Sequence, residues 1–99
     1  MEGYGKYAVY ILASRKYGTL YIGVTGNLVG RVVTHREEWL RGFTSRYHIH
    51  DLVYAEFHTQ PSAAIVREKQ LKKWRRAWKI ELIDKSNPDW QDLFDEIAG

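Results

Sequence analysis

Two strand-like segments with a short polar turn between them constrain the fold of this chain more than any other feature. Residues 6–13 (KYAVYILA) and 19–24 (TLYIGV) are rich in β-branched and aromatic residues, which favour strands. Residues 14–18 are mostly polar and end in glycine, which is typical of a turn. Because the gap is so short, the two segments predict a β-hairpin.

The remaining sequence predicts helices and one further strand. In chain order, the elements are a helix over about 27–40, an exposed loop over 41–50, a strand over 51–58, a helix from Pro61 to about Trp74, a helix over about 77–85, and a last helix capped by Asp89. That last helix would place Trp90, Leu93, Phe94 and Ile97 on one face. The predicted order is therefore ββα, then βα, then two C-terminal helices.

Length and composition exclude several classes of protein. A chain of 99 residues fits one domain, which we place over residues 1–99. The absence of cysteine excludes disulfide scaffolds, cysteine zinc sites and thiol catalysis. No apolar run is long enough for a transmembrane helix, and the first six residues do not resemble a signal peptide. We therefore expect a cytoplasmic protein with no membrane partner.

Basic residues gather between Arg67 and Lys79, where Glu68 is the only acid, while the chain from Glu81 onward is mostly acidic. The basic stretch is interleaved with Trp74 and Trp78. Such a pattern is typical of a helix that faces phosphates, although a solvated helix face is the ordinary alternative. Charge therefore suggests a nucleic-acid partner without indicating any chemistry.

The first predicted helix carries two polar residues on its apolar stripe. Leu28, Val32 and Trp39 form the stripe that should face the sheet, and Arg31 and His35 lie on it, four residues apart. Polar groups on such a face cost free energy unless partners await them. A lone histidine there would usually be a satisfied core residue. The pair instead suggests that both side chains point at one anionic oxygen.

The hairpin brings two tyrosines together. If its register pairs positions whose numbers sum to about 31, Tyr10 and Tyr21 are cross-strand neighbours on one face. Aromatic pairs of this kind are also common in ordinary cores. Gly23 is more unusual, because glycine weakens a strand and usually marks the close approach of another group.

Glu68 allows two roles. It can pair with Lys72 one turn later, which stabilises a helix by about 0.2–0.5 kcal/mol. It can also bind a hard cation, since one carboxylate with substrate phosphates and water suffices for Mg²⁺. The histidines at 48, 50 and 58 lack a coherent ligand spacing, and we assign them to loop and strand.

These motifs together resemble the GIY-YIG endonuclease superfamily, and most closely its small stand-alone members. The matching segments are Val9-Tyr10-Ile11, Leu20-Tyr21-Ile22-Gly23, Thr25-Gly26-Asn27-Leu28 with Arg31-Val32 and His35, Arg67-Glu68-Lys69, and Asn87-Pro88-Asp89-Trp90. The match covers the whole chain in order. It departs from the family at Ala8-Val9-Tyr10, which replaces Gly-Ile-Tyr, and at Gly30, where many members have a larger residue.

The resemblance implies an α+β fold, with a small three-stranded antiparallel sheet flanked by helices, and metal-dependent hydrolysis of phosphodiester bonds in DNA. The catalytic positions that it implies are Tyr10, Tyr21, Arg31, His35 and Asn87. It makes Glu68 the ligand of one Mg²⁺ or Mn²⁺ ion, and it places Gly23 and Asn27 near the site as structural residues.

The chemistry of these residue types fits hydrolysis. A tyrosine with a pKa of about 10 is a poor base at neutral pH, so it must pass its proton onward or be stabilised as a phenolate. We expect Tyr10 to be the general base, His35 to take its proton, and Tyr21 to position water or phosphate; the two tyrosines could exchange roles. Arg31 is permanently charged and suits a phosphate oxygen.

The expected substrate path combines the basic helix and the loop over 41–50. Arg46, Lys72, Lys73 and Arg75 would contact phosphates, which provides affinity without sequence information. We expect weak sequence preference, a role in DNA repair or processing, and a monomer or weak dimer. Selection for single strands, flaps or junctions stays open.

Two other functions compete with the nuclease. One is a nucleic-acid-binding module that keeps the fold without turnover. The other is a partner-binding domain that uses Trp74, Trp78 and Trp90, which is disfavoured because their apolar stripes predict core positions.

Overall fold

The computed structural model describes residues 5–40 and 49–99, and the predicted phosphate contact Arg46 lies outside them. Three antiparallel strands form one sheet in the order β2-β1-β3, with β1 at Tyr7–Ala13, β2 at Leu20–Thr25 and β3 at Asp51–His58. The helices are α1 (Leu28–Leu40), α2 (Pro61–Lys73), α3 (Arg76–Ser86) and α4 (Phe94–Ala98). The predicted α+β fold, a three-stranded sheet flanked by helices, is confirmed. Within the described residues no helix is both long enough and apolar enough to cross a membrane.

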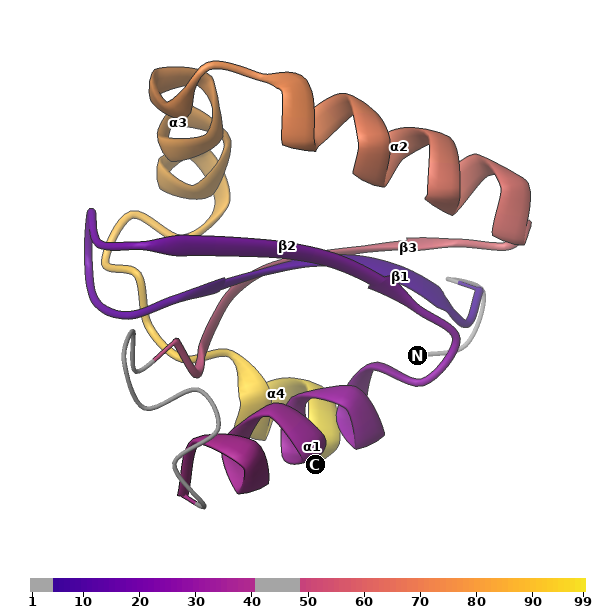
Figure 1. The fold of residues 1–99 in the computed structure, drawn as a ribbon, viewed down its shortest axis with the longest axis horizontal. Coiled ribbons are helices and arrows are strands. Elements are labelled where there is room, and N and C mark those ends of the chain that lie inside the picture. The colour runs from indigo at the N-terminus through magenta and orange to yellow at the C-terminus, as the bar shows by residue number, and fades with distance from the viewer. Residues whose placement is uncertain (1–4, 41–48) are drawn as a thin grey trace.

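Helices cover both faces of the sheet, and each face has its own core. Figure 1 shows α2 and α3 on one face, and α1 and α4 on the other. The central strand β1 is buried along almost its whole length, so its side chains alternate between the two cores. Val9 and Ile11 face α2 and α3, whereas Ala8 and Leu12 face α1 and α4. A strand buried on both faces explains the nearly continuous apolar run in the sequence.

The hairpin register differs from the predicted one by two residues. Tyr10 pairs with Gly23 and Leu12 pairs with Tyr21, so the position numbers of paired residues sum to 33. The turn is closed by a hydrogen bond from the Ser14 amide to the Thr19 carbonyl (3.0 Å), and Tyr17 within it has a positive φ of 61°. A shift of two residues keeps every side chain on its face. The tyrosines are therefore diagonal neighbours on one face and not direct cross-strand partners.

The last helix is shorter than predicted, and Asp89 does not cap it. Helix α4 begins at Phe94, and the residue before it, Leu93, occupies the cap position. Trp90 lies outside the helix with a φ of 53° and is buried in the core below α2 and α3, where its Nε1 donates a hydrogen bond to Asp84 (2.6 Å). Leu93 and Phe94 pack into the opposite core. Residues 87–93 thus carry the chain from one face of the sheet to the other.

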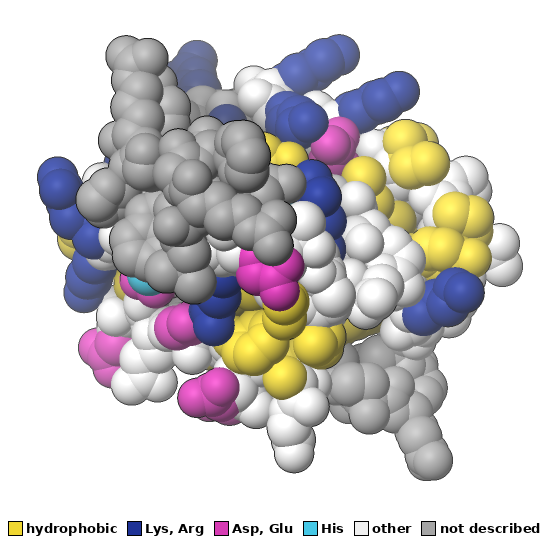
Figure 2. All heavy atoms as spheres, turned by 60° about the horizontal axis from the view of Figure 1, so that its bottom comes forward, with side chains coloured by type: hydrophobic (Ala, Val, Ile, Leu, Met, Phe, Trp, Pro, Cys, Tyr) yellow, Lys and Arg dark blue, Asp and Glu magenta, His cyan; other side chains and the backbone are white. Residues whose placement is uncertain are grey.

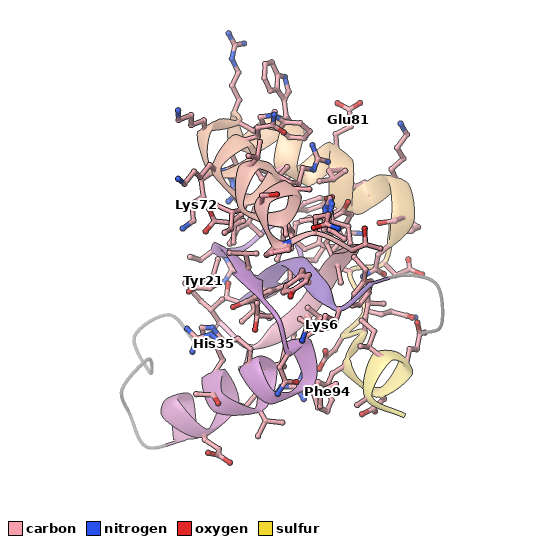
Figure 3. The ribbon with its side chains drawn as sticks, turned by 90° about the vertical axis from the view of Figure 1, so that its right-hand side faces the viewer. Lys6, Tyr21, His35, Lys72, Glu81 and Phe94 are labelled. Atoms are coloured by element: carbon pink, nitrogen blue, oxygen red, sulfur yellow. The ribbon has the colours of Figure 1, made fainter. Side chains whose placement is uncertain are left out.

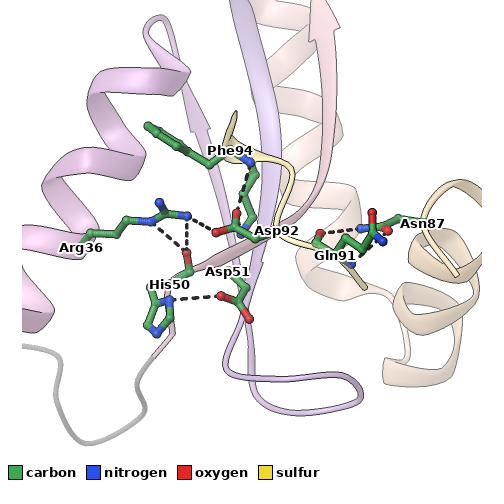
Figure 4. A network of polar contacts seen from close by, with 8 residues as sticks. Arg36, His50, Asp51, Asn87, Gln91, Asp92 and Phe94 are labelled. Atoms are coloured by element: carbon green, nitrogen blue, oxygen red, sulfur yellow. Dashed lines mark hydrogen bonds and ion pairs between the residues drawn. The ribbon is translucent and has the colours of Figure 1, made fainter. Parts of the chain in front are cut away.

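Asp92 fastens this crossing segment to β3 and α1 (Figure 4). Its carboxylate accepts hydrogen bonds from the Leu52 amide (3.1 Å) and the Phe94 amide (3.1 Å). It also pairs with Arg36, whose guanidinium donates to the His50 carbonyl at 3.3 Å. The C-terminal segment, the start of β3 and the helix α1 are therefore joined through one carboxylate.

A second polar cluster links β3 to α2 around the carboxylate of Glu56. The carboxylate accepts hydrogen bonds from the Tyr54 hydroxyl (2.6 Å) and from Arg67 Nε (3.1 Å), and it pairs with His58 Nε2 (2.7 Å). Burial by itself would raise the pKa of Glu56, but these three partners outweigh burial and lower the pKa below its usual value. The folded protein therefore favours the ionised carboxylate more than the unfolded chain does.

This cluster predicts a dependence of stability on acid pH. Because the folded pKa of Glu56 is lowered, its contribution to the free energy of unfolding is complete above the usual glutamate pKa and is lost as the pH falls below it. Urea unfolding between about pH 6 and about pH 3 should show a smaller acid loss in Glu56→Gln than in the parent protein. The exposed Glu96→Gln change is the control, and an equal loss in Glu56→Gln and the parent would contradict the prediction.

Candidate active site

The ring of Tyr10, which projects from β1, lies against the main chain of β2 because position 23 is a glycine. Its own side chain is buried, with 1% of the residue exposed. A Cβ atom added to Gly23 would lie 2.4 Å from both Cζ and the hydroxyl oxygen of Tyr10. No L side chain fits at that distance, so only glycine lets the ring occupy this place. The group whose close approach Gly23 predicted is the ring of Tyr10.

Three aromatic rings meet at this point, and we call them the tyrosine–histidine cluster: Tyr10, Tyr21 and His35. The ring centroids of Tyr10 and Tyr21 are 6.3 Å apart, and those of Tyr21 and His35 are 4.8 Å apart. The Tyr10 hydroxyl lies 3.4 Å from Nε2 of His35. His35 is buried, whereas Tyr21 is 38% exposed. The residues that the sequence placed on the hairpin and on the first helix are therefore neighbours, with Tyr21 on the solvent side.

Arg31 completes the cluster with a positive charge. Hydrogen bonds with the hydroxyls of Tyr10 and Tyr21 raise the pKa of Arg31. Burial raises the pKa of Tyr10, and the nearby Arg31 offsets only part of this effect. The phenol of Tyr10 is thus a weaker acid than free tyrosine, while the guanidinium beside it favours any negative charge that forms there.

The start of α1 explains how Arg31 is held. The Asn27 side-chain oxygen accepts a hydrogen bond from the Gly30 amide (3.1 Å), and its carbonyl accepts one from the Arg31 amide (3.0 Å). A Cβ atom on Gly30 would lie 2.4 Å from Nδ2 of Asn27. A glycine at position 30 therefore leaves room for this cap, and the cap fixes the main chain of Arg31.

Glu68 lies on α2, which covers the face of the sheet opposite to α1. Its carboxylate pairs with Lys72 at 2.8 Å, and its side chain is only 12% exposed, against 56% for Lys72. The hydrogen bond to Glu68 raises the pKa of Lys72, and an electrostatic interaction with Tyr21 adds to this effect. Figure 3 shows Lys72, Tyr21 and His35 along one side of the molecule, with Tyr21 between the other two. Glu68 is thus linked to Tyr21 on the edge strand β2 through Lys72.

The donors available here suit a hard cation that takes most of its ligands from elsewhere. Among the side chains that the structure describes (residues 5–37 and 49–99), no group of three or more histidines and carboxylates is placed to enclose a metal ion. Glu68 offers a single, largely buried carboxylate. Mg²⁺ is commonly held by one or two carboxylates together with substrate phosphates and water, so this donor set fits it.

Asn87 serves the main chain of another region. Its Nδ2 donates hydrogen bonds to the carbonyls of Val53 (3.0 Å) and Gln91 (2.9 Å), and its Oδ1 accepts one from the Gln91 amide (3.1 Å). All three bonds are made to the main chain of β3 and of the segment after α3, and Figure 4 shows those between Asn87 and Gln91. The amide shapes the turn that follows α3, and only the Asn-Pro pair in the sequence indicated a turn there.

The predicted phosphate contacts Lys72, Lys73 and Arg75 are exposed at the end of α2 and in the link to α3. Figure 2 shows Lys and Arg side chains at the top, left and right edges of the face that carries α1 and α4, and most of its acidic side chains toward the lower left. The core positions expected for the tryptophans are wrong for Trp78, which is 49% exposed. Trp90 is buried as expected, and Trp74 is half-buried.

Comparison with known proteins agrees with this geometry. Residues 6–81 match the GIY-YIG catalytic domain. The chain is 33% identical over 79 residues to a UPF0213 protein of Staphylococcus haemolyticus, a match that covers 80% of this chain and 95% of that protein. It is 32% identical over 78 residues to a UPF0213 protein of Staphylococcus epidermidis, covering 79% and 94% of the two chains. No solved structure matches the chain.

Proposed function

This chain belongs to the GIY-YIG family, and we propose that it is an endonuclease that hydrolyses phosphodiester bonds of DNA with one divalent cation. The observation that carries this proposal is the meeting of Arg31 with two tyrosine hydroxyls and His35 beside β2. An ordinary aromatic core needs no guanidinium. Among the side chains described, those of residues 5–37 and 49–99, no ion pair to a carboxylate neutralises Arg31, so its charge is available to an anionic substrate.

The exposures favour one assignment of the two tyrosines. A general base has to touch the attacking water, and Tyr21 is 38% exposed whereas Tyr10 is 1% exposed. We therefore assign the base to Tyr21 and exchange the roles first expected. Arg31 stabilises the Tyr21 phenolate and the negative charge that grows on the phosphate oxygens. Tyr10 and His35 support Arg31 and Tyr21 from the buried side.

The hydrolysis then needs few groups. The Tyr21 phenolate takes a proton from water, the water oxygen bonds to phosphorus, and the bond from phosphorus to the leaving oxygen breaks. Glu68 would hold the cation, which supplies positive charge to the phosphate and the leaving oxygen. The ion pair with Lys72 has to open for Glu68 to act in this way, and this is the observation that favours a non-catalytic binding module as the second candidate.

A cleavage assay separates the two candidates. The purified protein is incubated with supercoiled, single-stranded and branched DNA, with Mg²⁺, with Mn²⁺ or with EDTA. We expect products with a divalent cation and none with EDTA. Binding without cleavage under every condition would decide for the module, and neither binding nor cleavage would refute both.

The basic residues predict a graded loss of DNA binding. Replacing Lys72, Lys73 and Arg75 by alanine should weaken binding similarly for all sequences, and it should flatten the salt dependence by roughly one unit of slope per lost contact. Binding is measured over a salt series in EDTA. Alanine at Arg15 and Lys16, which are exposed in the hairpin turn, controls for charge alone. An unchanged affinity in the triple variant would show that these residues are an ordinary solvated surface and not phosphate contacts.

A further inference from the structure

A hollow on the surface of α3 lies outside the cluster described above. Its volume is about 360 Å³, and it is lined by Trp74, Trp78, Glu81, Leu82 and Lys85. Three of these five residues are apolar, and the volume lies at the lower end of the range for ligand sites. We refer to it as the tryptophan hollow.

The two tryptophans hold different positions in this hollow. Trp74 packs partly against the core below α2 and α3, and the Arg67 guanidinium carbon lies 5.1 Å from its ring centroid. Trp78 is 49% exposed, and its ring meets that of Trp74 nearly at a right angle (85°) with centroids 6.1 Å apart. Trp74 is thus fixed by its surroundings, and it supports a Trp78 ring that offers its surface to solvent.

The charges around the hollow indicate what kind of molecule it would accept. Arg75 lies over the Trp78 ring, with its guanidinium carbon 5.4 Å from the ring centroid. Lys73 is exposed beside it, and Lys85 lines the hollow. Glu81 is the only acid in the lining. A flat apolar surface with this excess of positive charge complements a flat apolar group that carries a phosphate.

We propose that the tryptophan hollow binds an unpaired base of a nucleic-acid strand, which stacks on Trp78 while Arg75 and Lys73 contact its phosphates. Stacking of a base on an aromatic side chain is tolerant of sequence, in keeping with the weak sequence preference expected from the sequence. A base inside a duplex is already stacked on its neighbours and would have to be extruded first. The hollow therefore selects substrates with single-stranded segments. This inference rests on the proposed function only in taking nucleic acid as the ligand.

The test compares two DNA ligands in EDTA, where metal-dependent cleavage cannot occur. A labelled single strand of about 12 nucleotides, within the usual range of site sizes, is titrated with protein, and so is the duplex of the same sequence. Trp78→Ala should weaken binding of the single strand between about fivefold and about a hundredfold, with little effect on the duplex. Trp78→Phe keeps an aromatic surface and should retain most of the affinity.

The control measurements test whether the variants stay folded and whether the effect is specific to Trp78. Trp78 and Val66 are both exposed, so alanine at either position should leave the far-UV circular dichroism and the Tm close to those of the parent protein. Val66→Ala on α2 removes apolar surface elsewhere and should bind both ligands like the parent.

Several outcomes would overturn the inference. One is a single-strand affinity that Trp78→Ala leaves unchanged, and another is an equal loss of affinity for both DNA forms. A third is a dimer of the parent protein, seen in sedimentation, that Trp78→Ala abolishes. That result would mean that a second copy of the chain occupies the hollow. Cleavage of DNA by a protein whose single-strand affinity does not depend on Trp78 would leave the nuclease proposal intact and refute the hollow. Trp78-dependent binding by a protein that never cleaves DNA would support the hollow and refute the nuclease proposal.

Discussion

Glu68→Gln is expected to lower the rate of metal-dependent DNA cleavage by about a thousandfold or more, while DNA binding persists. The change keeps the size of the side chain and removes the negative charge that a hard cation requires. It also breaks the ion pair with Lys72, but that lysine is 56% exposed, so the loss of stability should be small. The phosphate contacts of the basic residues do not use the carboxylate and should survive.

The measurement combines single-turnover cleavage with binding in EDTA and with calorimetric titration of Mn²⁺. Lys72→Met is the matched control, because it breaks the same ion pair and keeps the carboxylate. We expect Lys72→Met to retain Mn²⁺ binding and Glu68→Gln to lose it. Cleavage that continues at the parental rate in Glu68→Gln would show that another group binds the metal.

Arg31→Ala is expected to lower the cleavage rate at saturating DNA by about a hundredfold to a thousandfold. The guanidinium interacts with both tyrosine hydroxyls, and its removal takes away the positive charge that the proposed mechanism places beside the phosphate. Arg31→Lys keeps the charge without the planar, multiple donors, so we expect an intermediate rate. Affinity measured in EDTA should change far less than the rate.

A second variant separates the loss of the guanidinium from a displacement of the main chain at the start of α1. Asn27→Ala, which removes the cap in front of Arg31 and leaves the guanidinium, is the control for misplacement of the helix start. We expect it to retain more of the cleavage rate than Arg31→Ala, because its guanidinium is still present. A rate equal to that of the parent in Arg31→Ala would remove this residue from the mechanism.

The elements of the fold were predictable because each has a local signal. The strands have β-branched and aromatic runs, and Pro61 marks the start of α2. The hairpin register was not predictable, because it depends on the left-handed conformation of Tyr17 in the turn. The place of Trp90 was missed for a related reason. Its spacing to Leu93 fits one helical face, but a positive φ sends it to the opposite core.

The candidate site was predictable only in part. Arg31 and His35 were visible as polar residues on an apolar stripe, and Gly23 as a glycine inside a strand. Glu68 pairs with Lys72 on α2, and Lys72 interacts with Tyr21 on β2; no local pattern encodes this link, and only the family resemblance placed Glu68 with the tyrosines. The exposure of Trp78 was missed because its position in the sequence fits an apolar stripe as well as the buried residues do.

The crossing segment at 87–93 has a consequence for how this protein opens. Side chains of a strand alternate, so the two faces of the sheet carry separate cores that could loosen independently as partial unfolding units. Asn87 and Trp90 are anchored in one of them, and Asp92 fixes α1 in the other. Opening of α1 therefore strains bonds that begin on the far side of the sheet. Since Arg31 and Glu68 belong to opposite faces, this linkage makes the two halves of the proposed site form and melt as one cooperative unit.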